Sequence, residues 1–396
     1  MKFAKRIESL PPYLFAEIDK KRQAAIARGV DIINMGIGDP DQPTFKNITD
    51  AMHKAVDDPS THNYPPYQGM KEFREGVVKW FEERFGQKFN SDSECVSLIG
   101  SKEAIHNMIF ATIDQGDVAL LPDPAYPVYK SSTILSGGKP YVTPLLEKNN
   151  WLPDLTKIPN DIAHKANILM VGYPNNPTGA IASVEFYDEV IAFAKKHDII
   201  VLSDNAYSEL TFDGYVAPSI FQAKGARDVA LEFHSLSKTY NMTGWRVGFA
   251  VGNEKVVKAL GTMKTNIDSG VFKAIQRAGI AAFNTPKEVI QKNNSVYKER
   301  RDVAIAGLKE LGWNVKPIKG TFYLWLPIPP TFKNSADFAT AMLDKCGIVV
   351  PPGSGYGEYG EGYFRIALTI DKKRIQEAVL RMKKEGLVFA QTCSVN

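Results

Sequence analysis

The middle of the chain alternates short apolar runs with helical runs, and this alternation limits the fold more than any other feature. Apolar runs of strand length occur at 95–99, 118–121, 140–143, 168–172, 199–203, 229–233 and 247–251. Helical spacing fills the intervals, most clearly at 102–113 and 184–196. Strands that alternate with helices form a mostly parallel sheet with both faces covered. We therefore expect an α/β protein with a mostly parallel seven-stranded sheet.

The part of the chain beyond residue 285 predicts a second, smaller domain. It opens with a long, charge-rich helical pattern within 283–311, which can bridge two domains. The inward positions of this helix are expected at Val289, Val296, Val303 and Leu308. Patterns of strands and helices follow at 322–326, 336–346, 364–368 and 372–385. The predicted organisation is an N-terminal arm with part of the small domain (1–46), a large ligand-binding domain (47–285) and a small α+β domain (286–396).

Composition excludes several classes of protein. The chain has 396 residues, of which 44% are hydrophobic and 23% charged, as in ordinary globular enzymes. A net charge of +4 without a Lys/Arg-rich run argues against nucleic acid as a partner. No basic-then-apolar leader and no apolar run of membrane-spanning length occur. Cys95, Cys346 and Cys393 lack metal-binding spacing and suit a reducing compartment, so we expect a cytoplasmic enzyme without a metal.

Polar residues gather where the apolar run 229–233 ends, in a segment that we expect to fold as strand, turn and strand. Ser235 and Ser237 precede Lys238, and Arg246 follows eight residues later. Open α/β sheets bind ligands at this edge. An unprotonated lysine attacks a carbonyl, while hydroxyls and a guanidinium suit a phosphate. The set predicts an aldehyde cofactor that carries a phosphate; a solvated lysine near a turn is the alternative.

Two further strand ends carry polar groups that suit the same kind of cofactor. Asp204 needs a cation, and a protonated pyridine nitrogen of pyridoxal phosphate would serve. Tyr207 can donate a hydrogen bond to a ring oxygen, and so can the amide of Asn176 in the turn 172–179. The alternatives are a helix cap for Asp204 and a plain turn for Asn176.

Other segments each allow a ligand contact and a simpler interpretation. Ser101 and Lys102 stand at the expected start of a helix. The backbone amides there can bind a phosphate, or Ser101 can simply cap the helix. Tyr126 suits stacking on a flat ring or a place in the core, and the glycines around Gly38 suit close ligand approach or a tight turn. Arg365 lies in an apolar strand, where its fork suits a carboxylate. The proline-stiffened loop with Tyr64 and Tyr67 suits a binding loop, a subunit contact or a plain surface loop.

Together these residues resemble the class I/II aminotransferases, the fold-type I pyridoxal-phosphate enzymes, over nearly the whole chain. The matches in order are Asn176-Pro177-Thr178-Gly179, the Asp204/Tyr207 pair, Ser235-x-Ser237-Lys238, Arg246 and Arg365. Within the family, four segments look most like the LL-diaminopimelate aminotransferases: Pro11-Pro12-Tyr13, 36–41, Gly100-Ser101-Lys102 and 123–129. The resemblance implies a large pyridoxal-phosphate-binding domain and a smaller α+β domain.

The resemblance also implies residue roles. Catalysis would rest on Lys238, Asp204 and Tyr207. The cofactor contacts would be Ser101, Lys102, Tyr126, Asn176, Asp204, Tyr207, Ser235, Ser237, Lys238 and Arg246. The substrate would lie near Tyr13, Gly38, Lys102, Tyr126, Asn176 and Arg365. Tyr64 would reach the phosphate of the neighbouring subunit, so the active unit would be a homodimer that shares its sites.

The implied reaction is ping-pong transfer of an amino group from an L-amino acid, with LL-diaminopimelate favoured, to a 2-oxo acid such as 2-oxoglutarate. That donor would place the enzyme in lysine biosynthesis. Aspartate, alanine or aromatic donors remain alternatives, as do a C–S lyase and a non-catalytic sensor of the cofactor. Residues 266–270 lack the arginine that aspartate aminotransferases use against a distal carboxylate, and Tyr67 stands where some diaminopimelate enzymes carry a glutamate. What recognises the distal end of the donor therefore stays open.

Overall fold

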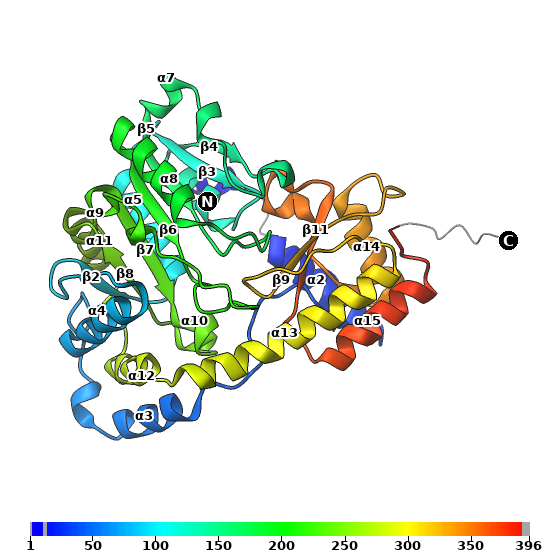
Figure 1. The fold of residues 1–396 in the computed structure, drawn as a ribbon, viewed down its shortest axis with the longest axis horizontal. Coiled ribbons are helices and arrows are strands. Elements are labelled where there is room, and N and C mark those ends of the chain that lie inside the picture. Colours follow the sequence, from blue (N-terminus) through cyan, green and yellow to red (C-terminus); the bar gives the residue numbers. More distant parts are fainter. Residues whose placement is uncertain (1, 11–13, 390–396) are drawn as a thin grey trace.

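The structure, a computed structural model, describes residues 2–10 and 14–389, with only the backbone of 14–18, and shows a large and a smaller body (Figure 1). The large body is built on one seven-stranded sheet with the order β2-β8-β7-β6-β5-β3-β4. Its strands are β2 (Cys95–Leu98), β3 (Val118–Asp123), β4 (Lys139–Pro144), β5 (Ala166–Val171), β6 (Ile200–Asp204), β7 (Ala230–Ser235) and β8 (Gly248–Gly252). Strands β3 to β7 run parallel, whereas β8 is antiparallel to both neighbours. The predicted mostly parallel sheet is confirmed.

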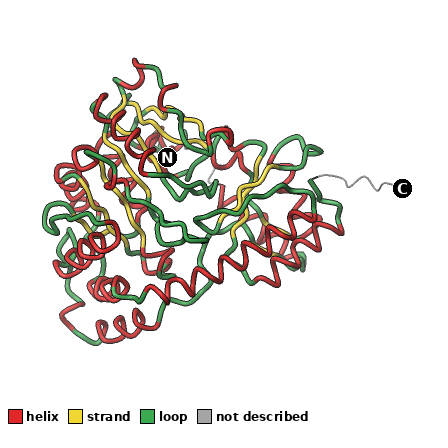
Figure 2. Tube along the Cα trace, viewed as in Figure 1, coloured by secondary structure: helices red, strands yellow, loops and turns green. Residues whose placement is uncertain are grey.

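Helices cover both faces of this sheet because successive strand residues point to opposite sides. In β5, Leu169 and Val171 enter one core, while Ile168 and Met170 enter the other. The first core also holds residues of α4 (Lys71–Phe85), α8 (Val184–His197) and α12 (Lys273–Phe283). The second holds residues of α5 (Ser101–Thr112), α6 (Val128–Leu135) and α11 (Glu254–Ile267). Figure 2 shows the same arrangement, with strands inside and helices around them.

The smaller body has its own core around two short sheets. Strand β9 (Tyr323–Pro327) pairs antiparallel with β11 (Tyr363–Ala367), and β1 (Ile33–Asn34) pairs parallel with β10 (Ile348–Val349). Helices α14 (Ser335–Cys346) and α15 (Lys372–Lys384) pack on them. Helix α13 (Lys287–Glu310) runs from the large body to the smaller one (Figure 1). The remaining helices are α1 (Lys5–Glu8), α2 (Leu14–Ala27), α3 (Lys46–Val56), α7 (Asn160–Ala163), α9 (Ala226–Val229) and α10 (Leu236–Thr239).

The inward face of α13 differs from the expected one. Leu308 is buried as predicted, but Val289 is 38% exposed, so its prediction was wrong. Arg300 and Arg301 occupy inward positions instead. The two terminal guanidinium nitrogens of Arg300, Nη1 and Nη2, each donate to the carboxylate of Asp41 at 2.7 Å, which pairs the buried charge. Apolar periodicity cannot reveal a helix face that buries arginines.

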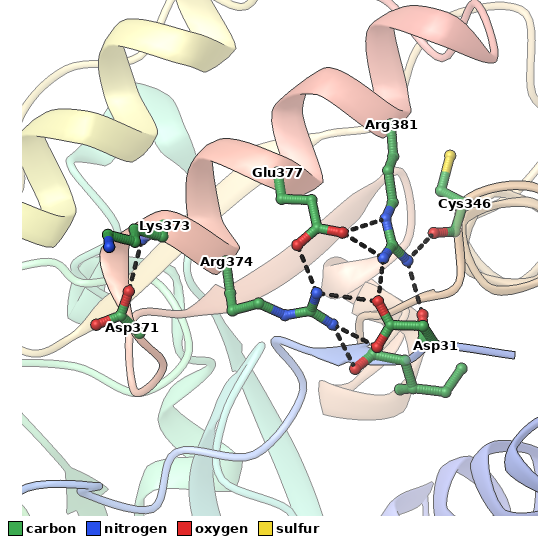
Figure 3. A network of polar contacts seen from close by, with 8 residues as sticks. Asp31, Cys346, Asp371, Lys373, Arg374, Glu377 and Arg381 are labelled. Carbon is green, nitrogen blue, oxygen red and sulfur yellow. Dashed lines mark hydrogen bonds and ion pairs between the residues drawn. The ribbon is translucent and has the colours of Figure 1, made fainter.

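Ion pairs join the N-terminal segment to the last helix (Figure 3). Arg374 donates to both carboxylate oxygens of Asp31, at 2.8 and 3.0 Å, and Arg381 contacts the same carboxylate. Arg381 also donates to the main-chain oxygens of Asp31 at 2.7 Å and Cys346 at 3.1 Å, and both arginines contact Glu377. These contacts fix the start of β1 in the smaller body and so place the loop 36–41 that follows it.

Among the described residues, no helix combines the length and the apolar character that crossing a membrane requires.

Candidate active site

A cavity of about 380 Å³ lies between the two bodies, at the carboxyl ends of β5, β6 and β7. The loop after β1 and strands β9 and β11 of the smaller body complete its wall. The predicted site residues that line it are Gly38, Ser101, Lys102, Tyr126, Asn176, Asp204, Tyr207, Ser235, Ser237, Lys238, Arg246 and Arg365. The fold thus brings together residues that lie more than 300 positions apart in the sequence.

Among the predicted site residues that the structure describes, Tyr64 does not line this cavity. It is 83% exposed, and its neighbour Tyr67 is 49% exposed. Tyr13 lies outside the described residues. The side chains of Tyr64 and Tyr67 are therefore exposed and do not contribute to the cavity of their own chain.

Lys238 lies in the single helical turn α10, which replaces the plain turn expected after β7. Ser235 caps this turn, because its hydroxyl accepts a hydrogen bond from the Ser237 amide at 3.2 Å. The amine Nζ donates to the carbonyl oxygen of Gly38 at 2.8 Å. Burial, opposed by the charge of Asp39, lowers the pKa of Lys238 to about 8. The lysine is therefore a partly buried amine at the cavity wall that becomes neutral far more readily than a solvated one.

Asp204 ends β6, and its two carboxylate oxygens have different surroundings. Oδ2 accepts a hydrogen bond from the hydroxyl of Tyr129 at 2.8 Å. Oδ1 is buried and has no hydrogen-bond partner among the described residues. Burial raises the pKa of Asp204, while the Tyr129 hydrogen bond lowers it. No helix begins at Asp204, so the alternative of a helix cap is wrong, and Oδ1 fits a protonated ring nitrogen.

The start of α5 lies at one corner of the cavity, together with Ser235, Ser237 and Arg246. Gly100 precedes it with φ 76°, no side chain caps it, and a Cβ at Gly100 would lie 2.1 Å from Nη2 of Arg246. A Cβ at Gly248 would lie 3.5 Å from the amide nitrogen of Ser101, and Gly248 pairs with Ser235 across β7 and β8. Unpaired amides at a helix start attract anions. Amides, hydroxyls and a guanidinium converge here, which fits a phosphate group.

Arg365 on β11 is 1% exposed and is held from several sides. Nη1 donates to Oδ1 of Asn176 and Nη2 donates to the carbonyl oxygen of Gly36, both at 2.7 Å. The ring of Tyr323 lies 4.0 Å from its Cζ, and the ring of Tyr356 lies 5.0 Å away. The guanidinium is thus fixed at the cavity wall, where a carboxylate can approach it.

Sequence reasoning missed two tyrosines that line the cavity. Tyr129 contacts Asp204, and the hydroxyl of Tyr323 lies 3.1 Å from that of Tyr207. Gly38 must be glycine here, because a Cβ would lie 1.8 Å from the Tyr323 hydroxyl. The available signal was that Tyr129 follows Tyr126 by three residues, the separation of a single turn, and the amide of Tyr129 indeed donates to the carbonyl oxygen of Tyr126 at 3.2 Å. Tyr323 carries no such signal in the sequence, because it is one residue of an ordinary strand pattern.

Comparison with known proteins agrees with this geometry. The sequence profile of the family described as "Aminotransferase class I and II" matches residues 30–382. The LL-diaminopimelate aminotransferase of Gloeobacter violaceus is 59% identical over 98% of this chain and 100% of its own length. The enzyme of the same name from Aquifex aeolicus is 50% identical over 96% of this chain and 98% of its own length.

Solved structures show the same fold. Substrate-bound BacF from Bacillus subtilis is 35% identical, with a TM-score of 0.95 over 99% of this chain and 100% of that one. A probable N-succinyldiaminopimelate aminotransferase from Thermus thermophilus is 33% identical, with a TM-score of 0.88 over 94% of this chain and 99% of that one. A profile that spans most of the chain, with full-length relatives at this identity, shows membership of a family. The chain belongs to the class I and II aminotransferases and is a pyridoxal-phosphate-dependent transaminase of fold type I.

Proposed function

We propose that this transaminase takes the amino group of LL-diaminopimelate and passes it to 2-oxoglutarate, as a step of lysine biosynthesis in the cytoplasm. One observation carries the choice of donor. Relatives named LL-diaminopimelate aminotransferase are 50–59% identical over at least 96% of this chain and at least 97% of their own length.

The cavity supplies matched partners for the two ends of the cofactor. Pyridoxal phosphate, when bound, provides an aldehyde for the amino group and an electron-withdrawing ring. Oδ1 of Asp204 would hold the ring nitrogen, and Asn176 and Tyr207 would face the ring oxygen. Tyr126 would stack on the ring. The groups for the phosphate end would be Ser101, Lys102, Ser235, Ser237 and Arg246.

Lys238 is the residue that moves the proton. Its pKa of about 8 leaves part of the population neutral near physiological pH, so Nζ can accept a proton from the substrate α-carbon. The same atom then returns the proton on the product side. Tyr207 stays protonated beside it, because burial raises its pKa well above the usual value. Its hydroxyl therefore remains available as a hydrogen-bond donor.

Arg365 would orient the substrate. Its fixed guanidinium offers a planar fork to the α-carboxylate, which suits bidentate binding. Gly38 and Lys102 also line the cavity, and we keep them and Tyr13 as further substrate contacts. Holding the carboxylate fixes the α-carbon relative to Lys238, which is how positioning lowers the barrier.

The active unit would be a homodimer. Tyr64 is 83% exposed, so it can contribute its hydroxyl to the phosphate of a second copy. The loop that carries it is supported from within the chain, since a Cβ at Gly270 would lie 2.9 Å from Cγ of Pro65. Sedimentation should show a dimer. The variant Tyr64→Phe should bind the cofactor more weakly while the dimer stays intact. A fully active monomer would contradict the shared site.

A panel of amino donors with 2-oxoglutarate tests the proposed reaction. The donors are LL-diaminopimelate, aspartate, alanine, phenylalanine and methionine, and glutamate formation is the readout. We expect kcat/KM to be highest for LL-diaminopimelate. A higher value for another donor would reject the substrate but keep the transaminase. Pyruvate and ammonia from a sulfur amino acid, formed without an oxo acid, would reveal a C–S lyase instead.

A further inference from the structure

Tyr129 links two groups that would act on different parts of the cofactor. It lies in the first turn of α6, is 5% exposed, and donates to Oδ2 of Asp204 at 2.8 Å. Its ring also meets that of Tyr126 edge to face, with centroids 5.9 Å apart and planes at 88°. One side chain therefore contacts both the carboxylate that would face the ring nitrogen and the tyrosine that would stack on the ring.

The neighbouring backbone leaves just enough room for this hydroxyl. Gly172 follows β5, and a Cβ there would lie 3.2 Å from Oη of Tyr129 and 3.5 Å from Cβ of Asp204. A side chain at position 172 would crowd both the Tyr129 hydroxyl and Asp204, and so would disturb the hydrogen bond between them. The three segments that meet here are the ends of β5 and β6 and the start of α6, so the contact depends on the fold and not on local sequence.

The direction of the hydrogen bond is fixed by chemistry. Burial, together with the charge of Asp204, raises the pKa of Tyr129 well above its usual value, so the hydroxyl stays protonated. It must then donate, and the carboxylate oxygen must accept. Burial raises the pKa of Asp204, and donation from Tyr129 is the largest of the contributions that oppose this rise, ahead of the backbone amide of Ala206 and the charge of His234. The other oxygen, Oδ1, is left for a partner in the cavity.

We infer that Tyr129 is a positioning residue for the cofactor, which keeps Asp204 ionised and turned so that Oδ1 faces the ring nitrogen. This inference rests on the proposed role of Asp204. Tyr129 acts through Asp204 and through the edge of Tyr126. We assign Tyr129 no contact with the substrate, so its substitution should affect cofactor binding and kcat without changing the affinity for the amino donor.

The variant Tyr129→Phe removes the hydroxyl and keeps the ring. The dissociation constant for pyridoxal phosphate, measured by equilibrium dialysis of the dimer, should rise roughly tenfold, as for a lost hydrogen bond to a charged group. On lowering the pH, affinity should begin to fall at a higher pH than in the wild type, because Asp204 has lost the donor that favours its ionised form. The KM for the amino donor should stay the same while kcat falls.

A matched control separates this effect from the loss of any buried hydroxyl. Tyr187 in α8 is 0% exposed and does not line the cavity, so Tyr187→Phe removes the same atom elsewhere. It should bind the cofactor as the wild type does. The second comparison uses Asp204→Ala alone and combined with Tyr129→Phe. If Tyr129 acts through the carboxylate, its substitution should cause no further loss of affinity once Asp204→Ala has removed that carboxylate.

The possible outcomes distinguish a failure of the inference about Tyr129 from a failure of the proposed role of Asp204. Wild-type affinity and pH dependence in a folded Tyr129→Phe protein would overturn the inference. An equal loss of affinity when Tyr129→Phe is added to Asp204→Ala would also overturn it, because that result would indicate packing alone. If Tyr129→Phe by itself does not fold, the comparison of Asp204→Ala with the double variant decides in the same way. Wild-type affinity in Asp204→Ala would instead reject the proposed role of Asp204, and this inference with it.

Discussion

Replacing Lys238 by methionine should stabilise the cofactor-free protein, although it removes the central residue of the site. Burial lowers the pKa of Lys238 from its usual 10.5 to about 8. Below pH 8 the amine is charged in both the folded and the unfolded chain, and the folded state bears the full cost of burying that charge. A pKa shift of this size lowers the free energy of unfolding of the wild type by roughly 3 kcal/mol at pH 7.

The sign and the pH window follow from the same shift. Between about pH 8 and 10.5 the folded lysine has lost its proton while the unfolded lysine keeps it, so wild-type stability rises with pH. The advantage of Lys238→Met should therefore fall from roughly 3 kcal/mol at pH 7 to about half of that at pH 9.5. The change with pH isolates the buried charge, because packing differences between lysine and methionine do not titrate.

Urea titration of the cofactor-free wild type and variant at both pH values measures these differences in the free energy of unfolding. Lys264 is the contrasting control: it is 0% exposed but pairs with Glu103 at 2.8 Å and Asp268 at 2.9 Å. Lys264→Met should destabilise the protein by roughly 3 kcal/mol, because it leaves partly buried carboxylates without their partner. A Lys238→Met advantage that does not change with pH would refute the reasoning.

Three further substitutions test the geometry of the cavity. Arg365→Lys replaces a planar fork by a point charge, so KM for amino and oxo acids should rise roughly tenfold or more in steady-state assays; an unchanged KM would remove Arg365 from the substrate site. Gly100→Ala places a Cβ against Arg246 at a residue with φ 76°, so pyridoxal phosphate should bind more weakly and the free energy of unfolding should fall by about 1 kcal/mol; unaltered dialysis and urea curves would contradict this. Gly38→Ala should displace the Tyr323 hydroxyl and cost about 1–3 kcal/mol of stability, and normal unfolding would show that the loop yields easily.

The large sheet was predictable because its signal is local. All seven strands lie within two residues of their predicted positions. Strands β3, β6 and β7 extend further than the apolar runs did, to Asp123, Asp204 and Ser235, so that polar residues end them. Most of the expected cofactor contacts line the cavity for the same reason, since they follow strands whose apolar runs are clear, whereas Arg246 precedes β8 and Tyr64 follows no predicted strand.

The parts that sequence reasoning missed depend on contacts between distant segments. Tyr129 and Asp204 are 75 positions apart, and Tyr207 and Tyr323 are 116 apart, so no local pattern joins them. The β1–β10 pair is too short to give a periodic signal. The face of α13 was misjudged because buried Arg300 takes an inward place that apolar periodicity assigns to valine. The domain boundaries at 46 and 285 and the roles of the individual site residues stay predictions.

The most direct test of the central claim is the half-reaction without an acceptor. The holoenzyme is mixed with LL-diaminopimelate alone, and the conversion of bound cofactor from its aldehyde to its amine form is followed by absorbance, for the wild type and for Lys238→Ala. We expect one amino group to be transferred per site in the wild type, and the rapid transfer to be lost in a folded Lys238→Ala protein. Transfer at an ordinary rate without Lys238, or release of ammonia in place of transfer, would contradict this expectation.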